Sequence, residues 1–278
     1  MKIKKIFQNL FKTIAIFIFK LIYGNVKVNN TLKSNSQYFK KEIRFEGCKK
    51  IYNLFTITKS RLYTDRIHDT AIIKDNIIVE EASFQLRNNF NSNINQNIVI
   101  KKGTPRVLKK LNGNLLSLLT GGGGNNNYFH WFFDVLPRLG IFEKKQSLKE
   151  LDYLLCPNLN LWQIKSLELL GFKRKQLLSS IKYRHIFADK IFATNHPWNF
   201  NPNIINDIEN LPEWISVWLK KKFLDKKSKK VFPKKIYIDR SDSVSNIKEY
   251  RSIINEKEII EFLKKEKFEI IQLSKLDL

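Results

Sequence analysis

Short apolar runs alternate with helical patterns over the second half of the chain, and this alternation limits the possible folds more than any other feature. "LDYLLCP" (151–157) predicts a buried strand, and "LWQIKSLELLGF" (161–172) a helix that stops at Gly171. "KYRHIFADKIFATN" (182–195) predicts further strand, and "LPEWISVWLKKKFLDKK" (211–227) an amphipathic helix with Pro212 at its start. Strands that alternate with helices predict an α/β layered fold.

The region before residue 112 is predicted to contain strands and hairpins. Its apolar runs are "KIYNLFTI" (50–57), "DTAIIKDNIIVEEASF" (69–84), with a turn at "KDN", and "NIVIKK" (97–102). Towards the other end, "KIYIDR" (235–240), "NEKEIIEFLKKE" (255–266) and "FEIIQL" (268–273) predict a βαβ unit, with Asn255 as the N-cap of its helix. These strands either join the first sheet or begin a second domain.

The lysine-rich run at 220–235 is broken by Pro233, which favours a helix end followed by a solvated linker. We therefore expect four parts: a basic amphipathic helix at 1–25, a Rossmann-like domain at 40–219, the linker at 220–235, and the start of a second Rossmann-like domain at 236–278.

The stretch "GGGGNNNYFHWFFDVLPRLG" (121–140) holds the best candidates for chemistry. On a helix, His130 and Asp134 are one turn apart and share a face, with Arg138 one turn further on. An Asp that holds a His nitrogen fixes the tautomer and raises the basicity of the imidazole, although Asp134 could equally be the base itself. An ordinary polar pair on a half-exposed helix is the structural alternative. The glycines permit a close backbone approach before a helix N-terminus, where anions bind, although a plain flexible loop fits them equally.

The net charge of +24 suggests anionic partners, but the abundance of Ile, Asn, Lys and Phe is typical of an AT-rich coding sequence, which would place most lysines on solvated surface. A nucleic-acid protein has the charge in its favour but no recognisable reading motif, so we expect no nucleic-acid partner. Cys48 and Cys156 are the only cysteines and the histidines are dispersed, so neither a disulfide framework nor a metal site is predicted.

The N-terminal segment, residues 1–25, is predicted to be a helix with an apolar stripe and with lysines mostly away from that stripe. Its longest uncharged run, 13–19, is far shorter than the ~20 residues of a membrane span. The pattern is typical of a helix that lies in the interface of an anionic membrane, but a helix packed on its own domain or on a partner fits equally well.

The segment "NYFHWFFDVLPRL" (127–139) resembles the signature of glycosyltransferase family 61, a group that includes capsular-polysaccharide biosynthesis proteins. "DYLLCP", "SLELLGF", "KIFATNHPW" and "KIYIDRSDSVSNIKEYRSIINEKEII" follow in the family's order, and the likeness covers roughly residues 45 to 278. The matching positions in the signature and in the last of these segments are Asn127, Tyr128, His130, Trp131, Asp134, Leu136, Pro137, Arg138, Arg240, Arg251 and Asn255.

The resemblance implies a GT-B arrangement of two Rossmann-like domains and transfer of a sugar, with inversion, from a nucleotide-sugar donor such as a UDP-sugar. By analogy, Asp134 or His130 would deprotonate the acceptor hydroxyl, with Asp134 slightly favoured, and no cofactor or metal would be required. Arg240 and Arg251 would bind the diphosphate. Asn127, Tyr128, Trp131 and Arg138 would support the site, Arg138 by locking the helix geometry.

Family members usually continue past the position matching Leu278 into a segment that holds much of the nucleotide site, so we expect an incomplete second domain. The leading hypothesis is an enzyme at the cytoplasmic face of the plasma membrane that acts on a cell-surface polysaccharide or lipid-linked glycan. The alternative is a non-catalytic fragment that binds glycan or membrane and works with a partner chain.

Overall fold

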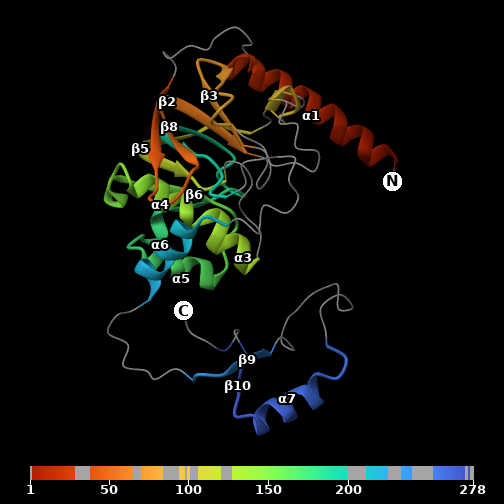
Figure 1. Ribbon diagram of the computed structural model, residues 1–278. Helices are drawn as coiled ribbons and strands as arrows, with labels where there is room; N and C mark the ends of the chain where they lie inside the picture. Colours follow the sequence, from red (N-terminus) through yellow and green to blue (C-terminus); the bar gives the residue numbers. More distant parts are fainter. Residues whose placement is uncertain are drawn as a thin grey trace. The chain divides into compact units, whose positions relative to one another are not determined.

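The computed structural model describes residues 2–28, 38–64, 70–83, 94–97, 99–100, 106–119, 127–198, 211–224, 233–239, 253–272 and 275. The chain separates into two compact units, Met1–Leu224 and Asp225–Leu278 (Figure 1). The division falls inside the lysine-rich segment at 220–235.

An eight-stranded mixed sheet forms the centre of the first unit, in the order β4-β3-β2-β8-β5-β6-β7, with β1 also paired to β2. The α/β class predicted from the sequence is confirmed. Strands β5, β6, β7 and β8 run parallel, whereas β1, β2, β3 and β4 are joined by antiparallel pairs, and β2 is antiparallel to β8. The strands are β1 (Phe39–Arg44), β2 (Ile51–Thr64), β3 (Thr70–Lys74), β4 (Ile77–Ile78), β5 (Lys109–Ser117), β6 (Tyr153–Cys156), β7 (Leu177–Ser179) and β8 (His185–Thr194).

The helices of the first unit are mostly short. They are α1 (Lys2–Tyr23), α3 (Tyr128–His130), α4 (Pro137–Glu143), α5 (Leu161–Leu169) and α6 (Glu213–Phe223), with a π-helical turn η2 (Trp131–Val135) between α3 and α4. Short 3-10 turns lie at η1 (Ile94–Gln96), η3 (Leu148–Glu150) and η4 (Arg174–Gln176).

Alternate residues of the central strands supply two separate apolar clusters, as the period of two in a strand requires. In β5 and the two residues that follow it, Leu116 and Leu118 join one cluster, whereas Leu115 and Leu119 join the other. The first cluster also contains Trp131 and residues of α4, α5 and α6, which lie on one side of the sheet (Figure 1). The helix that carries the candidate residues is therefore held against the sheet by its own apolar face.

Most of the predicted elements are confirmed. Asp75 and Asn76 have φ values of 49° and 60°, as the two turn residues of a type I′ hairpin require, and Gly171 has φ +94° after α5. The expected strand at "NIVIKK" is wrong in its described part, because Val99 and Ile100 are helical and pack in a small cluster with Tyr63 and Ile73.

Strand β5 has no counterpart in the prediction, because Gly113 and its asparagine neighbours break the apolar pattern. Gly113 has φ +120° at an irregularity in the β5–β8 pairing.

The second unit contains β9 (Ile236–Asp239), α7 (Glu256–Lys265) and β10 (Glu269–Gln272). The two strands pair in parallel as a separate sheet, which confirms the βαβ unit and shows that its strands do not join the large sheet. Asn255 occupies the N-cap position of α7, but its side chain makes no capping hydrogen bond. Gln272 Nε2 donates to Asp239 Oδ2 at 2.8 Å and ties the ends of the two strands together.

Helix α1 exposes an apolar face to solvent. Among the side chains described in it, nine large apolar ones are 45–73% exposed and recur every three or four residues, so they share one side of the helix. Tyr23, at its end, contacts His185 edge to face at 5.2 Å, and its hydroxyl accepts a hydrogen bond from Leu108 N. By length and composition alone, Ile6–Tyr23 is a candidate membrane span, and none of it is buried.

Candidate active site

The helical segment with the candidate residues begins shortly after β5 ends. Asn127 is its N-cap: the side-chain Oδ1 accepts from Phe129 N at 2.9 Å and from His130 N at 3.4 Å. This cap satisfies two of the free N–H groups that every helix start leaves. Asn127 therefore fixes the start of the helical segment that carries His130 and Asp134. Gly121 to Gly124 lie outside the described residues.

The helix is widened between Trp131 and Val135. Leu136 N donates to Trp131 O at 3.0 Å, which closes a π-helical turn. Pro137 follows directly at the first position of α4 and has no N–H to donate to the preceding turn. Single π-helical turns inside helices occur frequently at functional sites.

Three ring nitrogens from two different parts of the chain lie near the Asp134 carboxylate. His130 Nδ1 lies 2.6 Å from Oδ2, and Trp198 Nε1 donates to Oδ1 at 2.5 Å. His196 Nε2 is 3.8 Å from Oδ2, an electrostatic contact rather than a hydrogen bond. The side chain of Asp134 is only 8% exposed, whereas that of His130 is 39% exposed. The carboxylate is consequently enclosed, and the imidazole of His130 is accessible.

These contacts shift the pKa values of the cluster in opposite directions. Burial alone would raise the pKa of Asp134, but the N–H groups of His130 and His196 lower it well below its ordinary range. The hydrogen bond to Asp134 raises the pKa of His130 above its ordinary value. Burial lowers the pKa of His196, whose Nδ1 accepts from Trp198 N at 3.3 Å. His196 is thus held neutral, with its Nε2–H towards Asp134.

An ionised Asp134 can only accept hydrogen bonds, so His130 must carry a proton on Nδ1. In the neutral imidazole, Nε2 is then the nitrogen with a free lone pair. An exposed imidazole whose tautomer is set by a buried carboxylate is a suitable general base. The sequence left open which of the two side chains is the base. In the structure His130 is the accessible one, and the enclosed Asp134 carboxylate orients its imidazole.

The cluster lies where the strand order of the sheet reverses. The parallel strands follow the order β7-β6-β5-β8, so the chain leaves β5 to one side for β6 and later returns on its other side as β8. The segment with His130 and Asp134 follows the carboxyl end of β5, and His196 and Trp198 follow that of β8. Open α/β sheets bind ligands at this point of reversal, outside the carboxyl ends of the strands.

The model of a protein family described as Glycosyltransferase 61 matches residues 128–278. The match begins at the first residue of α3 and covers part of the first unit and all of the second. The chain belongs to glycosyltransferase family 61. No curated protein and no solved structure matches it. The resemblance expected from the sequence is confirmed at the level of the family, and glycosyl transfer is the chemistry of that family.

Three further residues of the family 61 signature lie on the same helical segment: Trp131, Arg138 and Tyr128. Trp131 is buried, and its Nε1–H donates to Ser166 Oγ at 2.8 Å. Arg138 is fully buried, its Nε donates to Asp134 O at 2.9 Å, and burial lowers its pKa to about 10, so it stays charged at neutral pH. Tyr128 is half exposed and stacks on Trp162 at 4.6 Å. Trp131 and Arg138 hold the helix, whereas Tyr128 lies at its surface.

Two residues that contact the Asp134 carboxylate were not predicted, His196 and Trp198. Both belong to "KIFATNHPW", the segment that directly follows strand β8, and His-Pro-Trp at the end of a buried strand was the available signal. Arg240 and Arg251 lie outside the described residues. Among the side chains that the structure describes, no group of three or more His, Cys, Asp or Glu residues could hold a metal ion.

Proposed function

We propose that this family 61 chain is an inverting glycosyltransferase. It transfers a sugar from a nucleotide-sugar donor, a UDP-sugar, to a hydroxyl group of a cell-surface polysaccharide or lipid-linked glycan precursor. The observation that supports this proposal is the His130–Asp134 pair, with a 2.6 Å contact, at the carboxyl ends of the strands where the sheet order reverses. The two units would correspond to the two halves of a GT-B arrangement.

In the proposed reaction, His130 Nε2 removes the proton from the acceptor hydroxyl as its oxygen attacks the anomeric carbon of the donor. The new C–O bond forms on one face of the sugar, and the bond to the nucleotide diphosphate breaks on the other face, which inverts the configuration. The diphosphate leaves with the bonding electron pair. Asp134 stabilises the imidazolium that forms and keeps Nδ1 protonated throughout.

Stabilisation of the departing diphosphate is the second requirement of this reaction. The family resemblance assigns it to Arg240 and Arg251, because guanidinium groups bind phosphate oxygens through paired hydrogen bonds. With these two positive charges available, the proposal requires no metal or other cofactor, and transfer is expected to continue in the presence of EDTA.

The function is tested by incubating the full chain with a series of UDP-sugars and lipid-linked or polysaccharide acceptors. We expect transfer from one donor, with a product whose anomeric configuration, determined by NMR, is opposite to that of the donor. A product with retained configuration would contradict direct displacement. Binding of no UDP-sugar, together with binding of glycan or membrane alone, would favour the non-catalytic alternative.

We also propose that α1 holds the protein at an anionic membrane, at the cytoplasmic face of the plasma membrane. Helix α1 exposes an apolar face and contains no acidic residue. Lys20 lies in its last turn. Nine exposed apolar side chains on one side of a helix are suited to the acyl region of a bilayer, and lysines are attracted to anionic headgroups. A lipid-linked acceptor would be present at the same surface.

The membrane proposal is tested by vesicle flotation. The full chain is expected to float with phosphatidylglycerol vesicles and to lose this association when Phe11, which is 73% exposed, and Phe17 are both replaced by Asp. Two carboxylates on the apolar face would oppose both insertion and the anionic surface. Lys175→Asp, a change on the exposed surface away from α1, is the matched control. Unchanged flotation of the double variant would exclude α1 as the anchor.

A further inference from the structure

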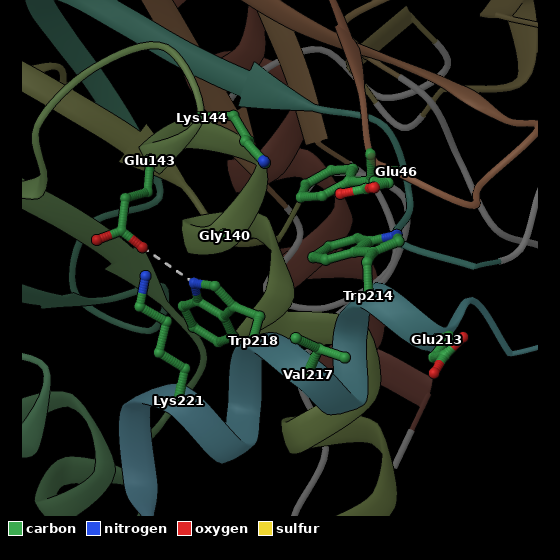
Figure 2. A pocket seen from close by; sticks show the side chains of 10 residues that line it. Glu46, Gly140, Glu143, Lys144, Glu213, Trp214, Val217, Trp218 and Lys221 are labelled. Atoms are coloured by element: carbon green, nitrogen blue, oxygen red, sulfur yellow. Dashed lines mark hydrogen bonds between the residues drawn. The ribbon is translucent and has the colours of Figure 1, made fainter.

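A cavity of about 580 Å³ lies between the turn after β1 and helices α4 and α6, and neither His130 nor Asp134 lines it. Phe45 and Trp214 stack at its wall with ring centroids 3.8 Å apart, and Trp218 and Val217 extend the apolar lining along α6 (Figure 2). At Gly140 a side chain would meet the Trp218 and Trp214 rings at 3.1–3.2 Å. The absence of a side chain there lets the two helices approach closely.

Three carboxylates and two lysines line this aromatic cavity together with the rings: Glu46, Glu143, Glu213, Lys144 and Lys221. Glu46 comes from the turn after β1, and Glu213 from the first turn of α6 (Figure 2). Binding sites of this size combine apolar walls with a few polar groups that fix the orientation of the ligand. Carboxylates accept hydrogen bonds, so they suit a ligand that donates several, as the hydroxyls of a sugar do.

A second cavity of about 570 Å³ adjoins the first and shares Glu143 and Lys144 with it. Lysines outnumber carboxylates in the lining of the second cavity, unlike that of the first. Lys145 and Lys149 line it beside Lys144, whereas its two carboxylates already accept hydrogen bonds: Glu143 from Lys222 Nζ at 2.5 Å and from Trp218 Nε1 at 3.0 Å, and Glu150 from Ser147 N at 3.0 Å. The second cavity is therefore basic.

We propose that the two cavities together form a saccharide subsite that binds an acidic segment of the acceptor glycan. A sugar ring would lie in the aromatic cavity, with its hydroxyls on Glu46 and Glu213, and the acidic group of a neighbouring sugar would contact Lys144 and Lys145. The identification of the saccharide as the acceptor rests on the proposed glycosyl transfer; the binding of an acidic saccharide does not.

The wall of the aromatic cavity is connected to the catalytic cluster by hydrogen bonds. Trp214 Nε1 donates to the Tyr52 hydroxyl at 2.8 Å, which in turn donates to Pro197 O at 2.9 Å. Pro197 directly precedes Trp198, whose Nε1 donates to Asp134. Along the helix, Glu143 follows Asp134 by nine residues, about 14 Å at 1.5 Å per residue. An acceptor held in the two cavities would contribute binding free energy from a part of the glycan remote from the reacting hydroxyl.

The subsite is tested by the intrinsic tryptophan fluorescence of the full chain, titrated with hexagalacturonate as an acidic probe and with maltohexaose as a neutral one. We expect hexagalacturonate to bind at least about tenfold more tightly than maltohexaose, since only the acidic probe can pair with the lysines. Inorganic phosphate is the third probe. Competition by phosphate at the concentration at which hexagalacturonate binds would show an anion site without a saccharide and overturn the proposal.

Two variants locate the binding, and a third is the control. Val217→Trp fills the aromatic cavity from a side chain that is 56% exposed, so the core is left intact. Lys144→Glu with Lys145→Glu reverses the charge of the basic cavity. Each is expected to weaken hexagalacturonate binding by about tenfold or more, whereas Lys175→Glu, an equivalent charge reversal elsewhere on the exposed surface, leaves it unchanged. Equal affinities in all four proteins would overturn the proposal.

The outcomes separate the subsite from the activity. His130→Gln changes no residue of either cavity, so it should bind hexagalacturonate as the unmodified chain does. Transfer without hexagalacturonate binding would remove the subsite and leave the proposed function standing. Binding that is lost in the two cavity variants, in a chain that transfers no sugar, would leave the subsite standing and remove the function.

Discussion

His130→Gln is expected to lower sugar transfer by about 10²–10⁴-fold while the protein stays folded, because the variant lacks the nitrogen that takes the acceptor proton. Glutamine retains an amide N–H that can donate to the Asp134 carboxylate in place of His130 Nδ1, so the buried charge keeps a partner. The measurements are initial rates of transfer and the circular dichroism of the variant. Full activity in His130→Gln would eliminate His130 as the base.

Asp134→Asn is expected to lower transfer by about 10³–10⁴-fold through the tautomer of His130. An asparagine amide group next to Nδ1 would donate to it, which moves the imidazole proton to Nε2 and leaves no lone pair for the acceptor hydroxyl. Asp134 is a positioning residue in this scheme. The side chain is buried and its carboxylate also accepts from Trp198, so overall folding must be checked alongside the rate.

The pH dependence distinguishes this role from a merely structural one. Since Asp134 raises the pKa of His130, the base is deprotonated only above the ordinary value of about 6.5, and transfer should increase with pH through a midpoint above that value. In Asp134→Asn the midpoint of the residual activity should shift to lower pH, because the carboxylate that stabilises the imidazolium is lost. The same midpoint in both proteins would contradict an interaction between Asp134 and the base.

Trp131→Ala is expected to destabilise the first unit by about 3–5 kcal/mol, the usual effect of removing a large buried aromatic side chain. Trp131 is 1% exposed and lies in the cluster shared by the sheet and its helices, edge to face with Trp162 at 6.1 Å. The alanine would leave a cavity directly behind the π-helical turn that carries Asp134. Urea unfolding followed by circular dichroism measures the change.

Two matched changes set the scale for Trp131→Ala. Trp131→Phe keeps most of the apolar contact and loses the hydrogen bond to Ser166 Oγ, whose own donation to Gln163 O remains, so a cost of about 1–2 kcal/mol is expected. Tyr128→Phe changes a half-exposed ring and should have almost no effect. If Trp131→Ala unfolded at the same urea concentration as Tyr128→Phe, the inferred role of Trp131 in the core would be incorrect.

Local patterns predicted the elements where a single element carries the signal. The apolar run of β6, the Gly171 stop after α5 and the two-residue turn before β4 depend on neighbouring residues only. The pair of His130 and Asp134 is of the same kind, because residues four apart on a helix are neighbours wherever the helix lies. Strand β5 was missed because Gly113 interrupts the apolar pattern. The strand is held extended by its pairing with β6 and β8, which no local pattern shows.

The sequence by itself determined the α/β class, the helix that presents His130 and Asp134, and the family. The tertiary structure decided which of the two is accessible: Trp198 and His196, more than sixty residues away, enclose Asp134 only because parallel pairing puts the ends of β5 and β8 at one edge. It also decided that Phe45, Gly140 and Trp214 line one cavity. Such contacts depend on packing between distant segments, and no local spacing encodes them.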